Sequence, residues 1–467
     1  MLNLNDLFLN LFKYYKNSLP WMYSRNIYIL IVLFESIIFV SLINLLFKDF
    51  YTFEKSIIFF YYFKLILWFV FSYIINRYKP NYQKYEFKKV HIRQIKKSII
   101  LIIIFSILEI LFLNIFNIIE QNFINLNNTL VFNLIFIVIC IFLNLIKNIF
   151  YYNLSQRKKR WILFNNQNDL LDKSDLNNNL IDIFSNQDVY SIKKINFKMY
   201  DGIVLVENKI KSSLKELLVD EIKDKKIKII SIEEWFHRYS QRIPVELIND
   251  KFIKKLEFKI YENKINNIFL IKRIFEFIFT LFLLLLSTPI LVFASILVYL
   301  EDNGPIFYSQ SRVGEYGKTF TIWKLRSMRV NAEKDGVKWA TKNDKRVTKT
   351  GKILRKTRID ELPQLIGVLQ GKMNLIGPRP ERPEFKDLLS KEINYYHIRS
   401  LMKPGITGWA QVNYPYGASV NDTKNKLSYD LYYLKNYSLL LDILIFFKTI
   451  RLIFNARGSE PESKISS

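Results

Sequence analysis

The chain has 467 residues, of which 50% are hydrophobic and 16% aromatic, and its formal net charge is +26. This combination is rare in soluble proteins and is typical of a membrane protein with a basic face toward anionic lipid or a phosphorylated substrate. No zinc-finger, RNP or basic-zipper pattern is present, so we expect no nucleic-acid partner. The single cysteine, Cys140, excludes an intramolecular disulfide, and the three histidines are too scattered for a metal site.

The chain opens with four apolar segments, which we interpret as a membrane helical bundle. They cover residues 27–47, 56–75, 98–119 and 129–146, each near the roughly 20 residues that a helix needs to cross a bilayer. Glu35, Lys64 and Glu109 interrupt them, and a charge inside a span is expected to face the bundle interior or a cavity. For Lys64, snorkelling toward the membrane surface is an equal alternative.

The connecting segments predict the orientation of these helices. Lys and Arg are concentrated in residues 76–97 and 156–160, whereas EQNFINLNN, between the third and fourth segments, has one acid and no Lys or Arg. By the positive-inside rule the basic segments are cytoplasmic. Four crossings then leave both the N-terminus and the rest of the chain in the cytoplasm.

The next part of the chain, residues 151–262, is interpreted as a small α/β domain. RWILFNN, DGIVLVEN and IKIISI resemble short buried strands, and the apolar spacing of SLKELLVDEIKDKK predicts a helix between the last two. Strand, helix and strand in this order predict a parallel, Rossmann-like sheet. Because no GxGxxG follows a strand, a structural or regulatory role is favoured over a catalytic one.

A fifth apolar run, residues 277–300, is long enough to span a membrane, but basic residues flank both of its ends. A full crossing would place the following basic domain outside the cell. Pro289 removes a backbone donor near the middle, and Ser287 and Thr288 can donate to the carbonyls that the proline frees. We therefore predict a re-entrant helix–break–helix that enters and leaves on one face, with a kinked full span as the alternative.

The segment RKTRIDELPQ, Arg355 to Gln364, puts two adjacent carboxylates, Asp360 and Glu361, into the most basic part of the chain. Pro363 is placed to open a helix through QLIGVLQG, so either carboxylate is a candidate N-cap, and this segment alone favours that interpretation. A helix start is also an anion site. There, one carboxylate can attack phosphorus while the other holds a divalent cation, and nearby cations keep both ionised.

Further motifs surround the carboxylate pair: the apolar helix with Ser287-Thr288-Pro289, then KLRSM, GKMNLIGPRP and KPGITGWAQVN. In this order, and with LRKTRIDELPQL among them, they resemble the bacterial sugar transferases, the monotopic polyprenyl-phosphate phosphoglycosyltransferases, over about residues 272–454. The N-terminal spans and the middle domain are similar to the long-form branch, which initiates exopolysaccharide, capsule or O-antigen synthesis. Many relatives carry Gly-Arg-Asn after AQVN, whereas this chain has Tyr414-Pro415-Tyr416-Gly417, which leaves open what replaces that arginine's phosphate contact.

Residues and resemblance together predict four regions: a membrane bundle at 1–150, the α/β domain at 151–262, an α+β monotopic catalytic domain with the re-entrant helix at 263–456, and a disordered tail at 457–467. The resemblance implies transfer of a sugar-1-phosphate from a UDP-sugar to membrane polyprenyl (undecaprenyl) phosphate, which gives polyprenyl-diphosphate-sugar and UMP. It also implies a multi-pass protein of the bacterial inner membrane, with the catalytic domain in the cytoplasm. The sugar, the role of the middle domain and the oligomeric state, a homo-oligomer included, stay open.

For the site, the resemblance implies that Asp360 is the nucleophile and forms a phosphosugar–aspartyl intermediate, and that Glu361 binds Mg²⁺. The predicted phosphate-binding residues are Lys324, Arg326, Arg355 and Arg379, the last on the nucleotide side. The alternative function is a non-catalytic membrane scaffold or copolymerase that binds anionic lipid. A polymerising glycosyltransferase is less favoured, because we find no DxD-type metal motif.

Overall fold

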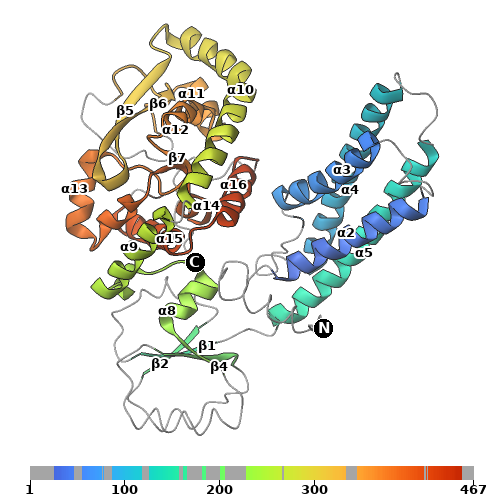
Figure 1. The fold of residues 1–467 in the computed structure, drawn as a ribbon, viewed down its shortest axis with the longest axis horizontal. Helices are drawn as coiled ribbons and strands as arrows, with labels where there is room; N and C mark the ends of the chain where they lie inside the picture. The colour runs from blue at the N-terminus through green and yellow to red at the C-terminus, as the bar shows by residue number, and fades with distance from the viewer. Residues whose placement is uncertain are drawn as a thin grey trace. The chain divides into compact units, whose positions relative to one another are not determined.

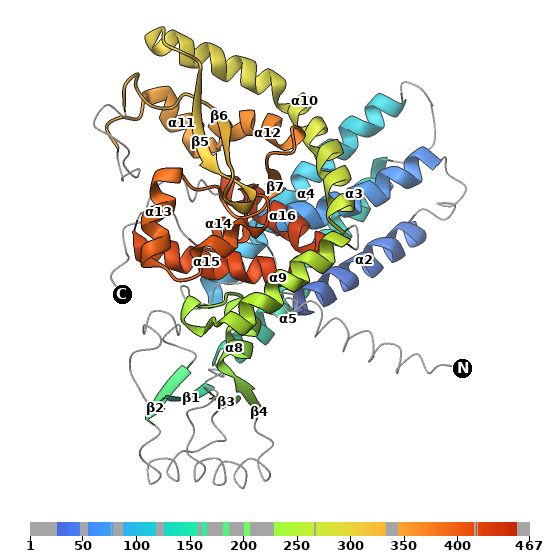
Figure 2. The same ribbon diagram turned by 60° about the vertical axis from the view of Figure 1, so that its left-hand side comes forward.

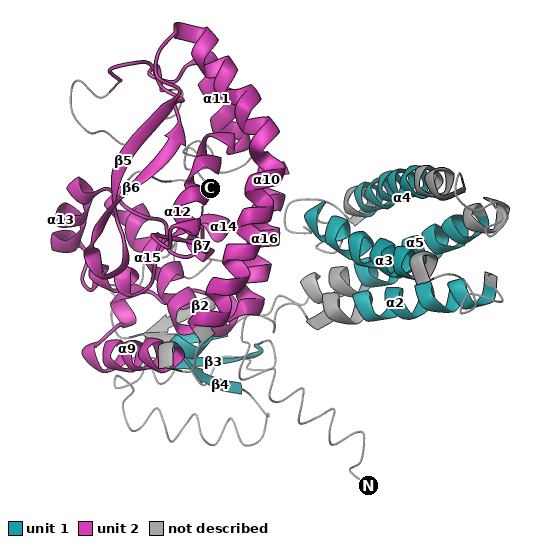
Figure 3. Ribbon diagram, turned by 45° about the horizontal axis from the view of Figure 1, so that its top comes forward, with its two compact units in different colours: residues 1–235 teal, residues 236–467 magenta. Residues whose placement is uncertain are grey.

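The computed structural model describes residues 26–46, 55–75, 77, 87–117, 126–156, 161–165, 181–185, 200–205, 228–265, 268–332, 344–414, 417 and 419–454. The chain divides into two compact units, residues 1–235 and 236–467 (Figure 1, Figure 3). Residues 236–262, expected in the middle domain, lie in the second unit, where the Trp409 indole donates to the Gln241 carbonyl at 3.0 Å. The other expected domain boundaries stay predictions.

Four helices occupy the predicted apolar segments of the first unit. They are α2 (Asn26–Leu46), α3 (Lys55–Ile74), α4 (Phe87–Asn117) and α5 (Leu126–Gln156). Among the described residues, two stretches are long and apolar enough to cross a membrane, Val131–Ile149 and Phe269–Asp302, and Ile31–Leu45 and Phe59–Ile74 are shorter apolar helices. These helices indicate a membrane-associated protein, while the number of crossings and their orientation stay predictions.

Four charged side chains of this bundle, Glu35, Lys64, Arg77 and Glu109, are buried in its interior. Arg77 and Glu35 are both fully buried and lie 2.8 Å apart, between Nη2 and Oε1. The Lys64 ammonium donates to Glu109 Oε2 at 2.8 Å and to Asn133 Oδ1 at 3.0 Å. Because Lys64 is only 6% exposed, the snorkelling alternative is wrong. Each charge is paired with a partner on another helix or segment, as expected for ions inside an apolar bundle.

The same unit contains a four-stranded sheet, formed by β1 (Trp161–Asn165), β2 (Ile181–Ser185), β3 (Gly202–Leu205) and β4 (Lys228–Ser231). The strand order is β2-β1-β3-β4 and every pair is parallel, which confirms the expected parallel sheet and adds β2 to it. The short helix α8 (Ile232–Trp235) follows β4. The helix expected in SLKELLVDEIKDKK lies outside the described residues, so the Rossmann-like class stays a prediction.

The second unit combines helices with two small sheets, as the α+β expectation requires. The antiparallel hairpin of β5 (Phe307–Val313) and β6 (Thr319–Leu325) forms one sheet, and β7 (Asn374–Ile376) pairs in parallel with β8 (Gly405–Thr407) in the other. The longer helices are α9 (Asp250–Ile265), α10 (Ile268–Asp302), α11 (Lys349–Thr357), α13 (Pro383–Glu392), α15 (Val420–Lys435) and α16 (Leu439–Phe454). The short ones are η4 (Phe236–Ser240), η5 (Val245–Leu247), η6 (Glu315–Gly317), η7 (Ile359–Gln364), α12 (Leu365–Leu369), η8 (Tyr396–Leu401) and α14 (Trp409–Asn413).

Helix α10 contains the fifth apolar run and is continuous over 35 residues, with Pro289 inside it. Two separate helices with a break between them are therefore not observed, although α10 changes direction along its length (Figure 2). Ser287 and Thr288 both donate to the carbonyl of Leu284, at 3.1 and 2.8 Å. This is one residue before Leu285, whose carbonyl loses its donor to the proline, so the expected compensation is displaced by one position.

Both ends of α10 are bound to the body of the second unit. Near the start, the Lys272 ammonium donates to the carbonyl of Ile376 at 2.9 Å. At the end, the Glu301 carboxylate accepts from the backbone N–H of Lys349 at 2.8 Å. Between them, Ala294 and Val298 pack against Leu325 and Leu354. Other α10 side chains are exposed and apolar, including Leu285, Leu286, Phe293 and Leu300. The helix therefore lies along the domain with one face left apolar.

Candidate active site

The carboxylate pair lies in a tight turn between two helices. After α11, Arg358 adopts the left-handed conformation (φ 61°, ψ 16°), and Asp360 and Glu361 follow within the 3₁₀ turn η7. Arg358 and Gln364 occupy the N-cap positions of η7 and α12, and neither end has a side-chain cap. The N-cap interpretation of the pair is therefore wrong. A left-handed arginine is strained, and such strain is concentrated at functional sites.

Glu361 is surrounded by cations. Its Oε1 accepts from Lys324 Nζ at 3.0 Å and from Arg379 Nη2 at 2.8 Å, and Arg358 Nη1 lies 3.6 Å from Oε2. Burial opposes ionisation of this carboxyl, but the three cations outweigh it and hold the pKa of Glu361 well below its usual range. Two predicted phosphate-binding residues, Lys324 of β6 and Arg379 of the turn after β7, thus meet at one carboxylate.

Asp360 has a different environment from its neighbour. The residue is buried, and within the described part of the chain its Oδ1 has no hydrogen-bond partner. Burial raises the pKa of Asp360, and the nearby charge of Glu361 raises it further, while Lys324, Arg358 and Arg355 act in the opposite direction. A buried carboxylate oxygen without a partner is costly. Such an atom calls for a functional explanation.

The two remaining predicted phosphate-binding residues differ in their contacts. Arg355, in the last turn of α11, is half-buried, and its guanidinium makes no hydrogen bond or ion pair among the described residues. Arg326 is engaged with the end of α10: its Nη1 donates to Asp302 Oδ2 at 2.9 Å, and its Nη2 donates to the carbonyl of Val298 at 3.3 Å. Arg355 is thus available to a ligand, whereas Arg326 fixes α10, and its phosphate contact stays a prediction.

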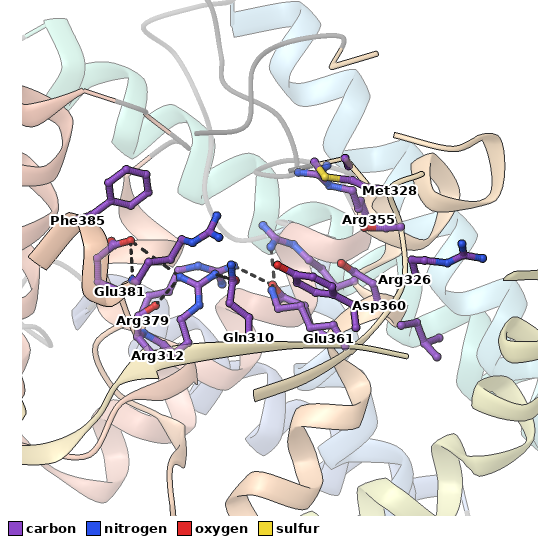
Figure 4. Close-up of a pocket in the computed structure, with 18 of the residues that line it drawn as sticks. Gln310, Arg312, Arg326, Met328, Arg355, Asp360, Glu361, Arg379, Glu381 and Phe385 are labelled. Carbon is purple, nitrogen blue, oxygen red and sulfur yellow. Dashed lines mark hydrogen bonds and ion pairs between the residues drawn. The ribbon is translucent and has the colours of Figure 1, made fainter. Parts of the chain in front are cut away.

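These side chains line a cavity of about 670 Å³ in the second unit (Figure 4). Asp360, Arg355 and Met328 lie toward one end of the view, and Phe385 and Glu381 lie at the other. All six predicted catalytic and phosphate-binding residues line it, namely Lys324, Arg326, Arg355, Asp360, Glu361 and Arg379. The fold therefore gathers at one cavity residues that are up to 55 positions apart in the chain, from Lys324 to Arg379.

Two further arginines, which the sequence patterns did not single out, hold the turn that carries Arg379. Arg399 donates through Nη2 to the Arg379 carbonyl at 2.8 Å, and Arg312 donates through Nη1 to the Pro380 carbonyl at 3.2 Å. Arg399 also lies 3.0 Å from Asp430 Oδ2. In a chain with 68 Lys and Arg, only their three-dimensional partners distinguish these two from a solvated basic face.

The segment that departs from the family motif also reaches the cavity. Tyr414 and Gly417 line it, and the Tyr414 hydroxyl donates to Asp422 Oδ1 at 3.0 Å. Lys426 of α15 lines the cavity as well, and its ammonium donates to the Gly417 carbonyl at 2.7 Å. Residues 415 and 416 lie outside the described residues. Lys426 thus places a cation beside the Tyr414–Gly417 segment.

The carboxylate pair is a candidate ligand set for a divalent cation. Within the described residues, no group of three or more His, Cys, Asp and Glu side chains could hold a metal by itself. Mg²⁺ typically takes one or two carboxylates and completes its shell with water and substrate phosphates. Among the described residues, Asp360 Oδ1 has no hydrogen-bond partner and Glu361 Oε2 has only the 3.6 Å contact to Arg358, so the pair fits a divalent cation whose other ligands are water or substrate oxygens.

Fold and site together define a class of protein. A long apolar helix with one exposed apolar face lies along an α+β domain, and a cation-lined cavity with a buried carboxylate pair opens in that domain. These features describe a membrane-associated protein whose site suits an anionic, phosphate-bearing ligand.

The chain belongs to the bacterial sugar transferase family, whose sequence model matches residues 267–456. It is 46% identical over 189 residues to the UDP-N-acetylgalactosamine-undecaprenyl-phosphate N-acetylgalactosaminephosphotransferase of Aeromonas hydrophila, covering 40% of this chain and 45% of the relative. It is 40% identical over 183 residues to the UDP-glucose:undecaprenyl-phosphate glucose-1-phosphate transferase of Escherichia coli K12, covering 39% of each. The uncharacterized sugar transferase EpsL of Bacillus subtilis is 35% identical over 198 residues, covering 42% of this chain and 94% of the relative.

The chain thus spans less than half the length of the first two of these relatives. The matched parts lie around the cavity and α10, since the family model begins at residue 267 and ends at residue 456. The two longer relatives are named for different sugars, so family membership leaves the transferred sugar open.

Proposed function

We propose that the protein transfers a sugar-1-phosphate from a UDP-sugar to undecaprenyl phosphate and releases UMP, as the first step of exopolysaccharide, capsule or O-antigen synthesis. The observation that carries this proposal is the buried Asp360 carboxylate, whose Oδ1 has no partner, beside a Glu361 that is held by Lys324 and Arg379. The names of the relatives support the donor and the acceptor.

In the first step, an Asp360 carboxylate oxygen attacks the phosphorus that bears the sugar. A P–O bond to Asp360 forms, the P–O bond to the UMP oxygen breaks, and UMP leaves with that electron pair. Both reacting groups are anionic, so the repulsion between them must be suppressed. Lys324, Arg355 and Arg379 line the cavity beside Asp360, and phosphoryl transfer depends mainly on such positioning and charge stabilisation.

In the second step, a phosphate oxygen of undecaprenyl phosphate attacks the phosphorus of the phosphosugar–aspartyl intermediate. The new P–O–P linkage forms as the bond to Asp360 breaks, and the Asp360 carboxylate is regenerated. Burial favours the attack by Asp360 in the first step, because a desolvated carboxylate is a stronger nucleophile than a hydrated one. The raised pKa of Asp360 is also consistent with a more basic oxygen.

Asp360 and Glu361 are the residues that would hold Mg²⁺ beside the donor's diphosphate. When bound, the ion would neutralise charge on the diphosphate and favour departure of UMP. Glu361 has a second role in this proposal, since it holds Lys324 and Arg379 in place.

For the membrane topology we propose that α10 enters and leaves the bilayer on the cytoplasmic face. Fully straight, 35 residues of helix would extend about 52 Å, well beyond the roughly 30 Å hydrocarbon core. Lys272 near its start and Glu301 near its end both hydrogen-bond to the same compact unit. A helix that crossed the bilayer straight would place these two ends on opposite sides of the membrane. The cytoplasmic side follows from the donor, because nucleotide sugars are cytoplasmic metabolites.

The proposal is tested by incubating membranes that contain the protein with undecaprenyl phosphate and a panel of UDP-sugars, and following UMP. We expect release with at least one UDP-sugar and the appearance of a lipid-linked diphosphate sugar. A folded protein that binds anionic lipid without releasing UMP from any donor would instead favour the scaffold or copolymerase alternative.

A further inference from the structure

The cavity has a second end, away from Asp360, to which the reaction steps above assign no role. Phe385 and Glu381 lie there, with Arg379, Arg312 and Gln310 between them and the carboxylate pair (Figure 4). Phe385 belongs to the first turn of α13, is half-buried and lines the cavity. An aromatic side chain is thus placed at the far end of a row of polar groups.

The hairpin gives a length scale for the cavity. On its strands, Tyr308 is paired with Lys324, whose ammonium contacts Glu361. Arg312 is four residues further along β5 and donates to the Pro380 carbonyl, next to Glu381. Four residues of strand extend about 13 Å, which is comparable to an extended nucleoside monophosphate. This length of strand, beside a cavity of about 670 Å³, is sufficient for one nucleotide to lie along the hairpin.

We infer that Phe385 is the surface on which the nucleobase of the donor, and of the released nucleoside monophosphate, stacks. This inference rests on the proposed function. The phosphates of the donor lie along Lys324 and Arg379, and the base projects beyond them. Aromatic rings bind bases by stacking, largely independently of base identity. Glu381, at the same end of the cavity as the ring, provides a carboxylate for ribose hydroxyls (Figure 4).

The other aromatic side chains that line the cavity among the described residues are placed differently. Phe307 and Tyr308 lie at the Lys324 end of the hairpin, where the register pairs them with Leu325 and Lys324. Tyr414 is bonded through its hydroxyl to Asp422. Phe385 is the one that shares the far end with Glu381 (Figure 4).

The test is titration calorimetry of the purified full-length protein with UMP and with ribose 5-phosphate, which lacks the base. For the wild type we expect UMP to bind at least about tenfold more tightly than ribose 5-phosphate. Phe385→Leu, which keeps an apolar side chain and loses the ring, should weaken UMP binding about tenfold and ribose 5-phosphate binding hardly at all. Phe385→Tyr should stay within about twofold of the wild type. The matched control is Leu388→Ala, at an exposed position of the same helix outside the cavity, with wild-type affinity for both ligands.

Failure of the inference and failure of the proposed function give different results. If the wild type binds UMP and releases it from a UDP-sugar, but Phe385→Leu binds UMP normally, the stacking role of Phe385 is overturned and the proposed function stands. If the Leu388→Ala control loses as much affinity, the effect is not local and the inference fails. If Phe385→Leu does not fold, equal affinity of the wild type for UMP and ribose 5-phosphate still overturns it. If the folded wild type neither binds nor releases UMP, the proposed function itself fails.

Discussion

Arg399 donates to the backbone carbonyl of Arg379 at 2.8 Å, from a half-buried position where it also pairs with Asp430. The guanidinium of Arg379 in turn contacts Glu361 at 2.8 Å. Arg399 and Asp430 also line the cavity, next to the turn that carries Arg379. Because Arg399 faces the turn and not Asp360, we regard it as a positioning residue.

Arg399→Lys should lower kcat/KM for the donor about tenfold. Lysine keeps the charge that balances Asp430 but lacks the forked donor that reaches the Arg379 carbonyl as well. A tenfold loss corresponds to about 1.4 kcal/mol of transition-state stabilisation. Steady-state kinetics with thermal unfolding of the same variant measures it, and Tm should change little. In an Arg379→Ala background the second substitution should have no further effect, because residues that act through one another are not additive. Full additivity would contradict this positioning role.

The pH dependence should report Asp360. Its pKa is raised mainly by burial and then by the charge of Glu361, and only the ionised form attacks phosphorus. The rate should therefore fall as the pH falls through this raised pKa, and the acid limb should lie above the range of an ordinary aspartate. Lys324 opposes the shift, so Lys324→Met should move the acid limb to higher pH. Lys324→Arg, which keeps the charge, is the control. Single-turnover rates across pH measure both, and an acid limb at the same pH in all three proteins would exclude Asp360 as the titrating group.

Glu361→Gln and removal of Mg²⁺ should each reduce activity about tenfold or more. The two treatments separate the two roles proposed for Glu361. EDTA removes only the metal, whereas the substitution also weakens the contacts to Lys324 and Arg379. UMP release with EDTA, followed by added Mg²⁺, measures the first role. Full activity in EDTA, together with low activity of Glu361→Gln, would contradict the metal role. Glu361 would then act only by holding Lys324 and Arg379 in place.

The topology predicts where the hairpin is accessible. Lys318 is exposed between β5 and β6, so Lys318→Cys in a Cys140→Ser background provides a single reactive thiol. An impermeant thiol reagent should leave it unlabelled in intact cells and label it after lysis. A cysteine at an exposed extracellular position of a known membrane protein is the positive control. Labelling of Lys318→Cys in intact cells would mean that α10 crosses the bilayer fully.

The predicted site residues that the structure brings together at one carboxylate pair are those whose surroundings in the sequence carry the signal. Asp360 and Glu361 stand out because two acids interrupt a basic segment, and Lys324 and Arg379 because each lies in a compact motif. The apolar segments of the first unit are similarly visible from length and hydropathy. These properties depend on neighbours in the chain, which a single sequence contains.

What was missed depends on contacts between distant parts of the chain. Arg326 lies two residues from Lys324, and the sequence predicts the same phosphate-binding role for both. In the structure, however, Arg326 donates to Asp302 at the end of α10. Arg399 is indistinguishable in sequence from other cations of its region. The interior position of Lys64 follows only from Glu109 on another helix. The partner of a charged side chain is a tertiary property, so its role could not be assigned before the fold.

The central claim is that Asp360 forms a covalent bond to the sugar phosphate, and it can be measured without the lipid acceptor. Purified protein is incubated with the UDP-sugar that supports turnover. The mass of the peptide containing Asp360 is measured by mass spectrometry, and the released UMP is quantified. We expect about one UMP per active site and a sugar-phosphate adduct on Asp360 that disappears when undecaprenyl phosphate is added. Asp360→Asn should show no adduct and lose about three orders of magnitude in turnover or more, with a Tm no lower than the wild type because a buried, incompletely paired charge has been removed. UMP release that requires the acceptor and leaves no adduct, or near-normal turnover by Asp360→Asn, would contradict the account.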